Sequence, residues 1–402
     1  MSELHYLDNN ATTRPAPEVV EAMMPFFTER WGNASSMYEF GGRVHADMEK
    51  ARAKVAALLH CDPGEIVFTS CGSESDNQAI FGTVESLGPA TTVITSAVEH
   101  PAVLQPCKAL EERGHRVVRV GVDGDGLLDM EAYREALAIP GPKLVTLMWA
   151  NNETGVLFPI PECASLAKAA GAVFHTDATQ AVAKVAAIDA SAVPFDMLSF
   201  SGHKIHAPKG IGVLYIRRGT PVRPFLLGGH QEKSRRAGTE NVPYIAGLGK
   251  ACELAAAELR DGTLDRIAAL RDRLQAGLLA IPDSRVNGSL VHRLPNTLNI
   301  SFSWIEGEAM LYHLGDAGIC ASSGSACTSG SLDASHVLRA MGVPFTALHG
   351  SLRFSLSRYT TDADVDAVLA VMPGIVEKLR ALSPFGPGSG EEPEDPAARR
   401  PA

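Results

Sequence analysis

Lys204 is a residue whose type and sequence neighbours could support covalent chemistry. It ends the segment 200–204 (FSGHK), which directly follows a short apolar run expected to be a strand at 196–199. A lysine at a strand end can reach into a cleft, where a desolvated amine can form a Schiff base with an aldehyde cofactor. A lone lysine in a loop is more often a surface residue, but the serine, glycine and histidine beside it could all serve a phosphate. The segment therefore favours a site for a phosphorylated aldehyde.

The carboxylate of Asp177 is a second candidate group. It follows an apolar strand predicted at 173–176, inside the segment 173–180 (VFHTDATQ). A carboxylate is costly to bury unless it is paired, and a protonated pyridinium nitrogen is a suitable partner. Holding that nitrogen charged makes pyridoxal phosphate an electron sink. The other interpretation, that Asp177 only caps the next helix, is equally open on this segment alone.

The segment 69–77 (TSCGSESDN) joins a predicted strand at 66–69 to a predicted helix from about residue 75. The free N–H groups at a helix N-terminus form a ready anion site. Gly72 lets the backbone approach a phosphate, and the Ser73 hydroxyl can donate to it. Serine and aspartate are also ordinary residues at the start of a helix, so this segment alone is a weak indication of a phosphate site.

The segment 321–331 (ASSGSACTSGS) surrounds Cys327 with small side chains. Such a segment has little apolar surface to bury, so we expect a mobile loop whose thiol can enter a cleft and leave it. The other interpretation is a flexible linker in which the cysteine is incidental. The sequence holds seven cysteines and none lies in a C-x-x-C pair, which disfavours a disulfide framework and a structural zinc site. Reduced thiols, one of them a nucleophile, fit this pattern.

Short apolar runs alternate with amphipathic stretches through most of the chain. They predict strands at 66–69, 92–96, 116–120, 144–149, 173–176, 196–199 and 211–216, with helices near 18–27, 44–59, 102–113 and 161–170. Runs of this kind indicate an α/β fold with a mostly parallel sheet covered by helices on both faces. Later in the chain the pattern changes to helices at 242–259, 264–280, 308–317 and 362–382 and strands at 296–302 and 351–355.

These changes divide the chain into four expected parts. Residues 1–14 form an N-terminal segment that packs with the small domain, 15–258 a large α/β domain that binds the cofactor, and 259–383 a small α+β domain that carries the Cys327 loop. The remainder, 384–402, is rich in proline, glycine and glutamate and is expected to be disordered.

Composition and charge exclude several classes of protein. The chain has 402 residues, 45% of them hydrophobic and 20% charged, and a net charge of −10 from 36 basic and 46 acidic residues. A wholly disordered or collagen-like chain is excluded, and the acidic balance argues against nucleic acid as the main partner. No apolar run approaches the roughly 20 residues that cross a bilayer, and the N-terminus lacks the features of a secretory signal, so we expect a cytoplasmic protein without membrane contact.

Eight motifs distributed over the chain resemble those of cysteine desulfurases. They are DNNATT (8–13), EHPAV (99–103), NNETG (151–155), HTDATQ (175–180), SGHK (201–204), RRAGTEN (235–241), SGSACTSGS (323–331) and RFSLSRYT (353–360). The match is to the nitrogenase-associated, NifS-like branch within the class V aminotransferase family, and it runs from about residue 4 to residue 383. It implies a fold-type I enzyme that depends on pyridoxal 5′-phosphate and forms a homodimer.

The resemblance also implies roles around the cofactor. Lys204 is implied as the Schiff-base lysine, Asp177 as the partner of the pyridine nitrogen, and His100 as an acid/base stacked on the ring. The other implied cofactor contacts are Gly72, Ser73, Ser201, Gly202 and His203 around the phosphate, Thr239 added to it by the other subunit, and Asn152 and Gln180 near the phenolic oxygen. Read without the family, His100 before Pro101 could merely cap a helix.

For the substrate, the resemblance implies that Arg353, helped by Asn152, holds the carboxylate of L-cysteine, a bidentate task suited to a guanidinium. Read without the family, Arg353 could instead pair with a core carboxylate. Cys327 is implied as the nucleophile that takes the sulfur as a persulfide, leaves L-alanine, and passes the sulfur to an iron–sulfur scaffold serving nitrogenase. It is also a candidate transient ligand of an iron–sulfur cluster. Cys320 is an additional thiol close to this segment.

Other functions remain open from the sequence. An aminotransferase would use the same cofactor but has no use for a thiol on a mobile loop. A selenocysteine lyase would need the same atoms as a cysteine desulfurase. A sulfur carrier without enzymatic activity would not need every catalytic position to be filled, as it is here. We therefore expect a sulfurtransferase acting on L-cysteine.

Overall fold

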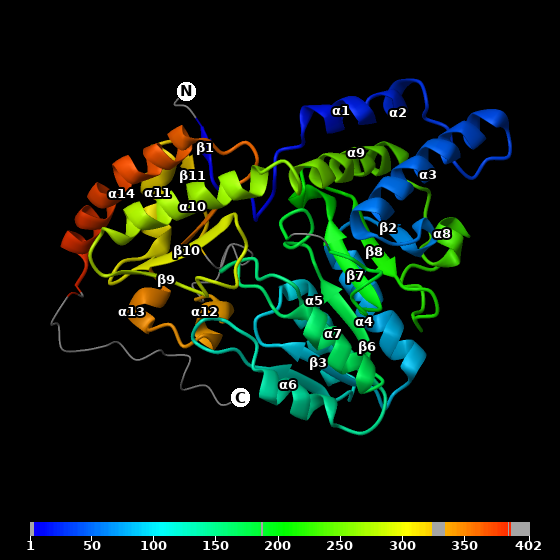
Figure 1. Ribbon diagram of the computed structural model, residues 1–402, viewed down its shortest axis with the longest axis horizontal. Helices are drawn as coiled ribbons and strands as arrows, with labels where there is room; N and C mark the ends of the chain where they lie inside the picture. Colours follow the sequence, from blue (N-terminus) through cyan, green and yellow to red (C-terminus); the bar gives the residue numbers. More distant parts are fainter. Residues whose placement is uncertain (1–3, 186–187, 324–333, 385, 387–402) are drawn as a thin grey trace.

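A central sheet with helices on both faces lies beside a smaller sheet (Figure 1). The computed structural model describes residues 4–185, 188–323, 334–384 and 386. Within these residues the large sheet has seven strands, in the order β2 (Ile66–Thr69), β8 (Gly212–Ile216), β7 (Met197–Ser201), β6 (Val173–Asp177), β5 (Lys143–Met148), β3 (Thr92–Ser96) and β4 (Val117–Val120). Only β8 runs antiparallel to its neighbours among them. The expected α/β fold with a mostly parallel sheet is confirmed.

The central strands are apolar on both faces, which explains their continuous hydrophobic runs. Val93 and Leu144 pack into a cluster with the helices on one face, whereas their neighbours Ile94 and Val145 pack into the main core on the other. Consecutive residues of a strand point to opposite faces, so a sheet covered on both sides needs apolar side chains at every position.

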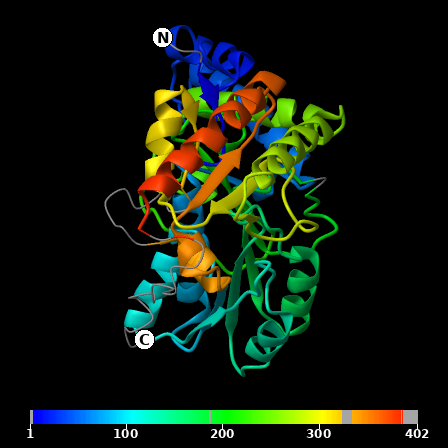
Figure 2. The same cartoon turned by 90° about the vertical axis from the view of Figure 1, so that its left-hand side faces the viewer.

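Helices cover the two faces of this sheet (Figure 2). They are α1 (Pro17–Met23), α2 (Pro25–Thr28), α3 (Glu39–Leu59), α4 (Gly72–Leu87), α5 (Pro101–Glu112), α6 (Met130–Leu137), α7 (Ile160–Ala169), the short α8 (Gln231–Ser234) and α9 (Val242–Glu258). Two single turns of 3₁₀ helix complete this part, η1 (Pro63–Glu65) and η2 (Gly202–Lys204).

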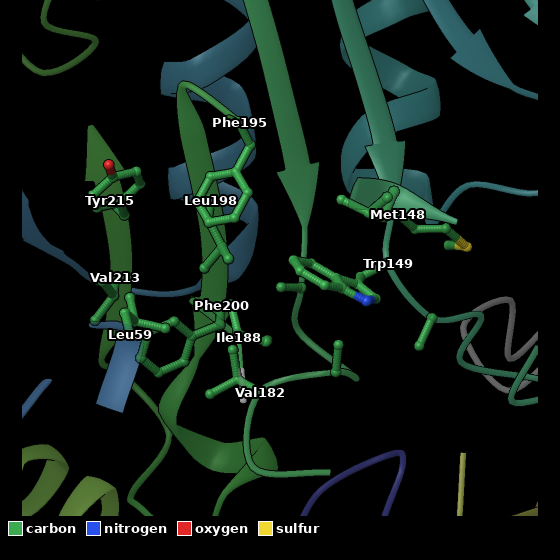
Figure 3. Packing of buried hydrophobic residues seen from close by; sticks show 14 of the residues in the cluster. Leu59, Met148, Trp149, Val182, Ile188, Phe195, Leu198, Phe200, Val213 and Tyr215 are labelled. Carbon is green, nitrogen blue, oxygen red and sulfur yellow. The ribbon is translucent and has the colours of Figure 1, made fainter. Parts of the chain in front are cut away.

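An aromatic cluster packs against the central strands, from the amino end of β7 to the carboxyl end of β5 (Figure 3). The Phe195 ring makes edge-on contacts with Trp149 and Tyr215, with ring centroids 6.0 Å and 5.6 Å away. Trp149 directly follows β5, and its backbone N–H donates to the carbonyl of Asp177 at 2.8 Å. This packing fixes the strand ends from which the polar residues below emerge.

The smaller sheet is antiparallel and has its own core. It has the order β12 (Ser351–Ser355), β10 (Thr297–Phe302) and β9 (Ser284–Val286), covered by α10 (Thr263–Leu279), α11 (Gly307–Asp316) and α14 (Asp362–Leu382). Two short helices, α12 (His336–Ala340) and α13 (Phe345–Leu348), lie toward the large sheet (Figure 1).

The N-terminal segment joins the two parts. β1 (His5–Tyr6) pairs with β11 (Ile319–Cys320), and Leu7 is buried in the core of the small sheet. A few residues later, the backbone N–H of Thr13 donates to the carbonyl of His203. The segment thus passes from the small sheet to the strand end that carries Lys204. The four-part division stays a prediction, and of the tail 384–402 only residues 384 and 386 lie within the described chain.

Several boundaries differ from expectation. The helix predicted at 18–27 is two helices, because Pro25 has no N–H to continue the hydrogen-bond ladder of α1. The helix expected from about residue 75 begins at Gly72, and α3 begins at Glu39 instead of 44. No helix among the described residues is long and apolar enough to cross a bilayer, and the cysteines of that part are free thiols.

Candidate active site

Four expected site residues come together at one edge of the large sheet. β3, β5, β6 and β7 run parallel, so their carboxyl ends meet at that edge. His100 follows β3, Asn152 follows β5, Asp177 ends β6 and Ser201 ends β7. The parallel pairing of these strands therefore brings the four residues close together at one edge of the sheet.

The Lys204 amine points toward the N-terminal segment. The residue lies in η2, directly after β7, and Nζ donates to the backbone carbonyls of Asn10 at 2.6 Å and Ala11 at 2.7 Å. The side chain is partly buried. The surface-lysine interpretation is therefore wrong, and the amine lies among backbone groups that orient it.

A cradle suited to a phosphate lies at the start of α4. The register places Thr69 opposite Gly212 and Gly212 opposite Ser201, which brings the helix start beside the end of β7. A Cβ atom at Gly72 would lie 3.2 Å from Thr179 Oγ1 and 3.5 Å from Ser201 Cβ. The side chain of Cys71 does not cap the helix, so its first N–H groups are available to an anion.

The remaining expected phosphate contacts differ in exposure. Gly202 is buried beside Ser201, whereas Ser73 is exposed on the first turn of α4. His203 Nδ1 lies 3.1 Å from Thr12 Oγ1, and burial together with the charge of Lys204 lowers the pKa of His203 to about 4. Thr239 lies exposed on the stretch after α8. Its expected contact requires a second subunit and stays a prediction.

Asp177 lies in a buried polar network. Its Oδ1 accepts from the backbone N–H of Thr179 at 2.9 Å, so part of the carboxylate does serve a turn, as the capping interpretation proposed. Behind it, His175 is buried between Thr146 Oγ1 and Ser199 Oγ, each 2.8 Å from a ring nitrogen. Burial lowers the pKa of His175 to about 3, so this ring is neutral at physiological pH.

Asp76 is a second buried carboxyl in this network that the sequence interpretation missed. One of its oxygens has no hydrogen-bond partner, and it lies 3.6 Å from His175 Nε2. Burial and the neighbouring Asp177 raise the pKa of Asp76 well above its usual range. Burial and the nearby Asp177 thus both disfavour the charged form of Asp76.

His100 caps a helix, and the cap determines which ring nitrogen carries the proton. It is the N-cap of α5, where Nδ1 accepts from the backbone N–H of Ala102 at 3.1 Å. In the neutral ring the proton must then be on Nε2. Burial lowers the pKa of His100, with a further lowering by Lys204 and His336 and an opposing effect of Asp177. The capping interpretation is correct, and it does not exclude the acid/base role.

Arg353 reaches from β12 in the small sheet to the edge of the large one. Its Nη1 donates to the carbonyl of Asn152 at 3.0 Å, and its Nη2 donates to Asp8 Oδ1 at 2.8 Å. The side chain is buried, and its Nε has no partner. Arg353 therefore does pair with a carboxylate, Asp8, as the alternative interpretation proposed. A substrate carboxylate would share the guanidinium with it.

Asn10 connects these groups, although the sequence interpretation gave it no role beyond the DNNATT motif. Its side-chain amide donates to the carbonyl of Asn152 at 3.1 Å and to Thr297 Oγ1 at 2.9 Å. Its own carbonyl accepts from Lys204 Nζ and, at 3.0 Å, from Gln180 Nε2. One residue of the N-terminal segment thus holds the lysine, the glutamine and the small sheet in one arrangement.

Cys327 lies outside the described residues, but both flanks of its segment are described. Before it, Ser322 and Arg353 exchange two backbone hydrogen bonds. After it, Ser335 Oγ donates to Glu153 Oε2 at 2.5 Å, and His336 Nε2 lies 3.0 Å from the carbonyl of Glu99. The first flank is thus attached to β12 of the small sheet, beside the Arg353 backbone, and the second to residues that follow β3 and β5 of the large sheet.

Glu99 should make stability depend on pH. Burial, and then Asp177, raise the pKa of this carboxyl to about 8, and one of its oxygens has no partner. Between an ordinary glutamate pKa near 4.5 and about 8, the folded state therefore binds more protons than the unfolded state, so stability falls as pH rises. We expect Glu99→Gln to reduce this decline, measured as the urea midpoint of the holoenzyme from pH 5 to pH 8. The exposed control Glu112→Gln should keep the wild-type slope, and equal slopes for E99Q and wild type would contradict the assignment.

The aminotransferase class-V family profile matches residues 5–368. The chain belongs to this family. A relative from Trichormus azollae named cysteine desulfurase is 58% identical over 381 residues, 94% of each chain. The cysteine desulfurase NifS of Azotobacter vinelandii is 54% identical over 393 residues, 97% of each chain. A solved structure described as a NifS-like protein has a TM-score of 0.87 at 38% identity, covering 94% of this chain and 99% of that one.

These matches confirm the family resemblance and the fold type, and the cofactor of this family is pyridoxal 5′-phosphate. The residues at the sheet edge fit that group. A side chain at position 72 would crowd Thr179 in the cradle, the helix start is uncapped, and Lys204 and Asp177 lie at adjacent strand ends. No group of three or more metal-ligating side chains is found in the described part of the chain.

Proposed function

We propose that this protein is a cysteine desulfurase, which takes the sulfur of L-cysteine as a persulfide on Cys327 and releases L-alanine. The main support is the arrangement at the sheet edge. The Lys204 amine and the Arg353 guanidinium are bridged by Asn10 and Asn152. The flanks of the Cys327 segment bond to the Arg353 backbone on one side and to Glu153 on the other. The names of the relatives support the same reaction.

When bound, pyridoxal 5′-phosphate supplies an aldehyde for the substrate amine and an electron sink for negative charge at the substrate Cα. Gly72, Ser201, Gly202 and His203 would hold its phosphate, Asp177 would pair with the pyridine nitrogen, and His100 would contact the ring. Asn152 and Arg353 would bind the substrate carboxylate. The Lys204 amine would move a proton at the substrate Cα.

Cys327 takes the sulfur in the next step. Its thiolate attacks the substrate sulfur, so that an S–S bond forms and the Cβ–S bond breaks. The bonding pair stays with carbon, and Cβ takes up a proton to become the methyl group of alanine. A free thiol with a pKa near ~8.5 is only a few per cent ionised at pH 7, so the step needs a base. The family resemblance gives this role to His100. Because Nε2 carries the proton in the neutral ring, His100 would have to take the thiol proton at Nδ1 and give up the hydrogen bond from Ala102.

The partners follow from this assignment. A second copy of the chain would add Thr239 to the phosphate and cover exposed apolar side chains such as Trp31, Met37 and Leu227. An iron–sulfur scaffold, in this branch one that serves nitrogenase, would accept the sulfur, and a transient cluster contact of Cys327 belongs to the same hypothesis. The cytoplasmic location stays a prediction.

The products test the proposed reaction. With L-cysteine and an external thiol, the holoenzyme should form alanine and sulfide in equal amounts, and no keto acid. The reason is that the cofactor returns unchanged while the sulfur leaves through Cys327. Amino-acid analysis, sulfide release and keto-acid detection measure this in one reaction. Keto acid in place of alanine would indicate an aminotransferase, and absence of both products would contradict the proposal.

A further inference from the structure

A second lysine faces the polar cluster around Lys204. Lys184 is partly buried, and its Nζ donates to Gln180 Oε1 at 2.6 Å and to Asn10 Oδ1 at 3.3 Å. In the described part of the chain both of its hydrogen-bond partners are neutral amide oxygens, and no carboxylate forms an ion pair with it. An unpaired cation is costly to desolvate, so a lysine in this place requires an explanation.

The contact with Lys184 determines which way the Gln180 amide points. A lysine ammonium presents only donors, and Gln180 turns its amide oxygen toward Lys184 Nζ. Its NH₂ group is then directed to the Asn10 carbonyl, which also accepts from Lys204. The reversed amide would place a donor against a donor at one end and an oxygen against an oxygen at the other.

Several positive groups surround Lys184. Lys204 and Arg353 face it, and together with burial they lower the pKa of its amine to about 7. The charge of Lys184 also lowers the pKa of His203 and of His206. Burial is the larger cause, and each pKa is about 4. Lys184 therefore lies within electrostatic range of the Lys204 amine and adds no ion pair that would neutralise it.

We propose that Lys184 is a positioning residue that keeps the Gln180 amide turned with its N–H groups toward the Asn10 carbonyl and the cofactor's phenolic oxygen. This inference rests on the proposed function, because it uses the expected place of Gln180 beside that oxygen. The contacts of Lys184 are with the amide oxygens of Gln180 and Asn10. It acts through Gln180, and its charge acts in the same direction by disfavouring a second proton near Lys204.

The test is the pH dependence of the visible absorption of the holoenzyme, which reports protonation of the lysine–cofactor linkage. Lys184→Met removes the donor and the charge, so the protonated form is favoured and the midpoint should rise by about one pH unit. A matched control is Lys209→Met, which removes an exposed lysine from the loop between η2 and β8. We expect K209M to leave the midpoint within about 0.2 pH units of wild type.

The double variant separates orientation from charge. Gln180→Leu should itself raise the midpoint, and adding K184M to it should produce less than half the shift that K184M causes alone, because the shared effect has already been lost. An equal shift in both backgrounds would show that Lys184 acts by charge only and would overturn the proposal. An unchanged midpoint in Q180L would instead show that Gln180 does not lie at the cofactor, which contradicts the proposed site.

A second variant keeps the proposal testable if K184M does not fold or does not bind the cofactor. Lys184→Gln keeps an N–H donor for Gln180 without the charge, and we expect it to shift the midpoint by less than half of one pH unit. K184M is expected to shift the midpoint by about one pH unit, because it removes both the donor and the charge. An equally large shift in K184Q would also overturn the orientation role. Thermal midpoints of each variant identify any general loss of structure.

Discussion

Replacing Lys204 by arginine is expected to lower the turnover of L-cysteine by about 10²–10⁴-fold, the range that general acid–base catalysis contributes. Arginine keeps the positive charge and can still donate to the carbonyls of Asn10 and Ala11, which Lys204 contacts now. A guanidinium, however, is not deprotonated in proteins and cannot take a proton from the substrate. The change therefore removes the chemistry while retaining the contacts, and sulfide release under saturating L-cysteine measures it.

The matched control for this substitution is Lys209→Arg, on the exposed side of the same loop. It should retain the parent rate and the yellow colour of the bound cofactor. K204R should lose the covalent attachment, which mass spectrometry detects after borohydride reduction of the holoenzyme. A K204R protein that still releases sulfide near the parent rate, or borohydride labelling at another lysine, would remove Lys204 from the centre of the mechanism.

Replacing Cys327 by serine should lower sulfide and alanine release by at least about 100-fold while leaving the cofactor bound. A serine hydroxyl is far less ionised and less nucleophilic than a thiol, so it cannot take the sulfur. Mass spectrometry of the wild type after L-cysteine should find one added sulfur atom on the peptide that contains Cys327. The same peptide of C327S should carry none.

Cys320 is the appropriate comparison, because it lies close in the sequence and in a defined strand. It belongs to β11, beside Tyr6, and burial followed by Asp8 raises the pKa of its thiol. A raised pKa leaves less thiolate, so Cys320→Ser should keep the parent rate. Sulfur found on Cys320 instead of Cys327, or full activity in C327S, would show that the wrong thiol was assigned.

The strands were the most predictable part of the fold. The predicted ranges 66–69, 92–96 and 351–355 agree with β2, β3 and β12. Continuous apolar runs bounded by polar residues leave little freedom, because a sheet covered on both faces needs every position to be apolar. Helix α6 was missed because it is short and buries few of its residues, among them Tyr133 and Leu137. Such a helix depends on its Asp129 cap as much as on its periodicity.

The residue types of the candidate site could be predicted from the sequence, but the hydrogen bonds and ion pairs between them could not. Lys204, Asp177 and Gly72 each have a local signal, because a strand end or a helix start is a property of neighbouring residues. Asp8, Asn10 and Lys184 had none, since their partners are distant in the chain. A pattern of nearest neighbours contains no information about such partners.

The sequence by itself determined the chemical inventory: a lysine and a carboxylate after apolar strands, a glycine where α4 begins, and a cysteine among small residues. Periodicity and local steric preferences are enough for that, because they act over a few residues. Only the tertiary structure decided that the Asn10 carbonyl would hold the Lys204 amine, 194 positions away, and that Asp8 would pair with Arg353, 345 positions away. Those contacts exist because the N-terminal segment crosses from the small sheet to the large one, and the free energy that selects this path comes from burial in both cores at once.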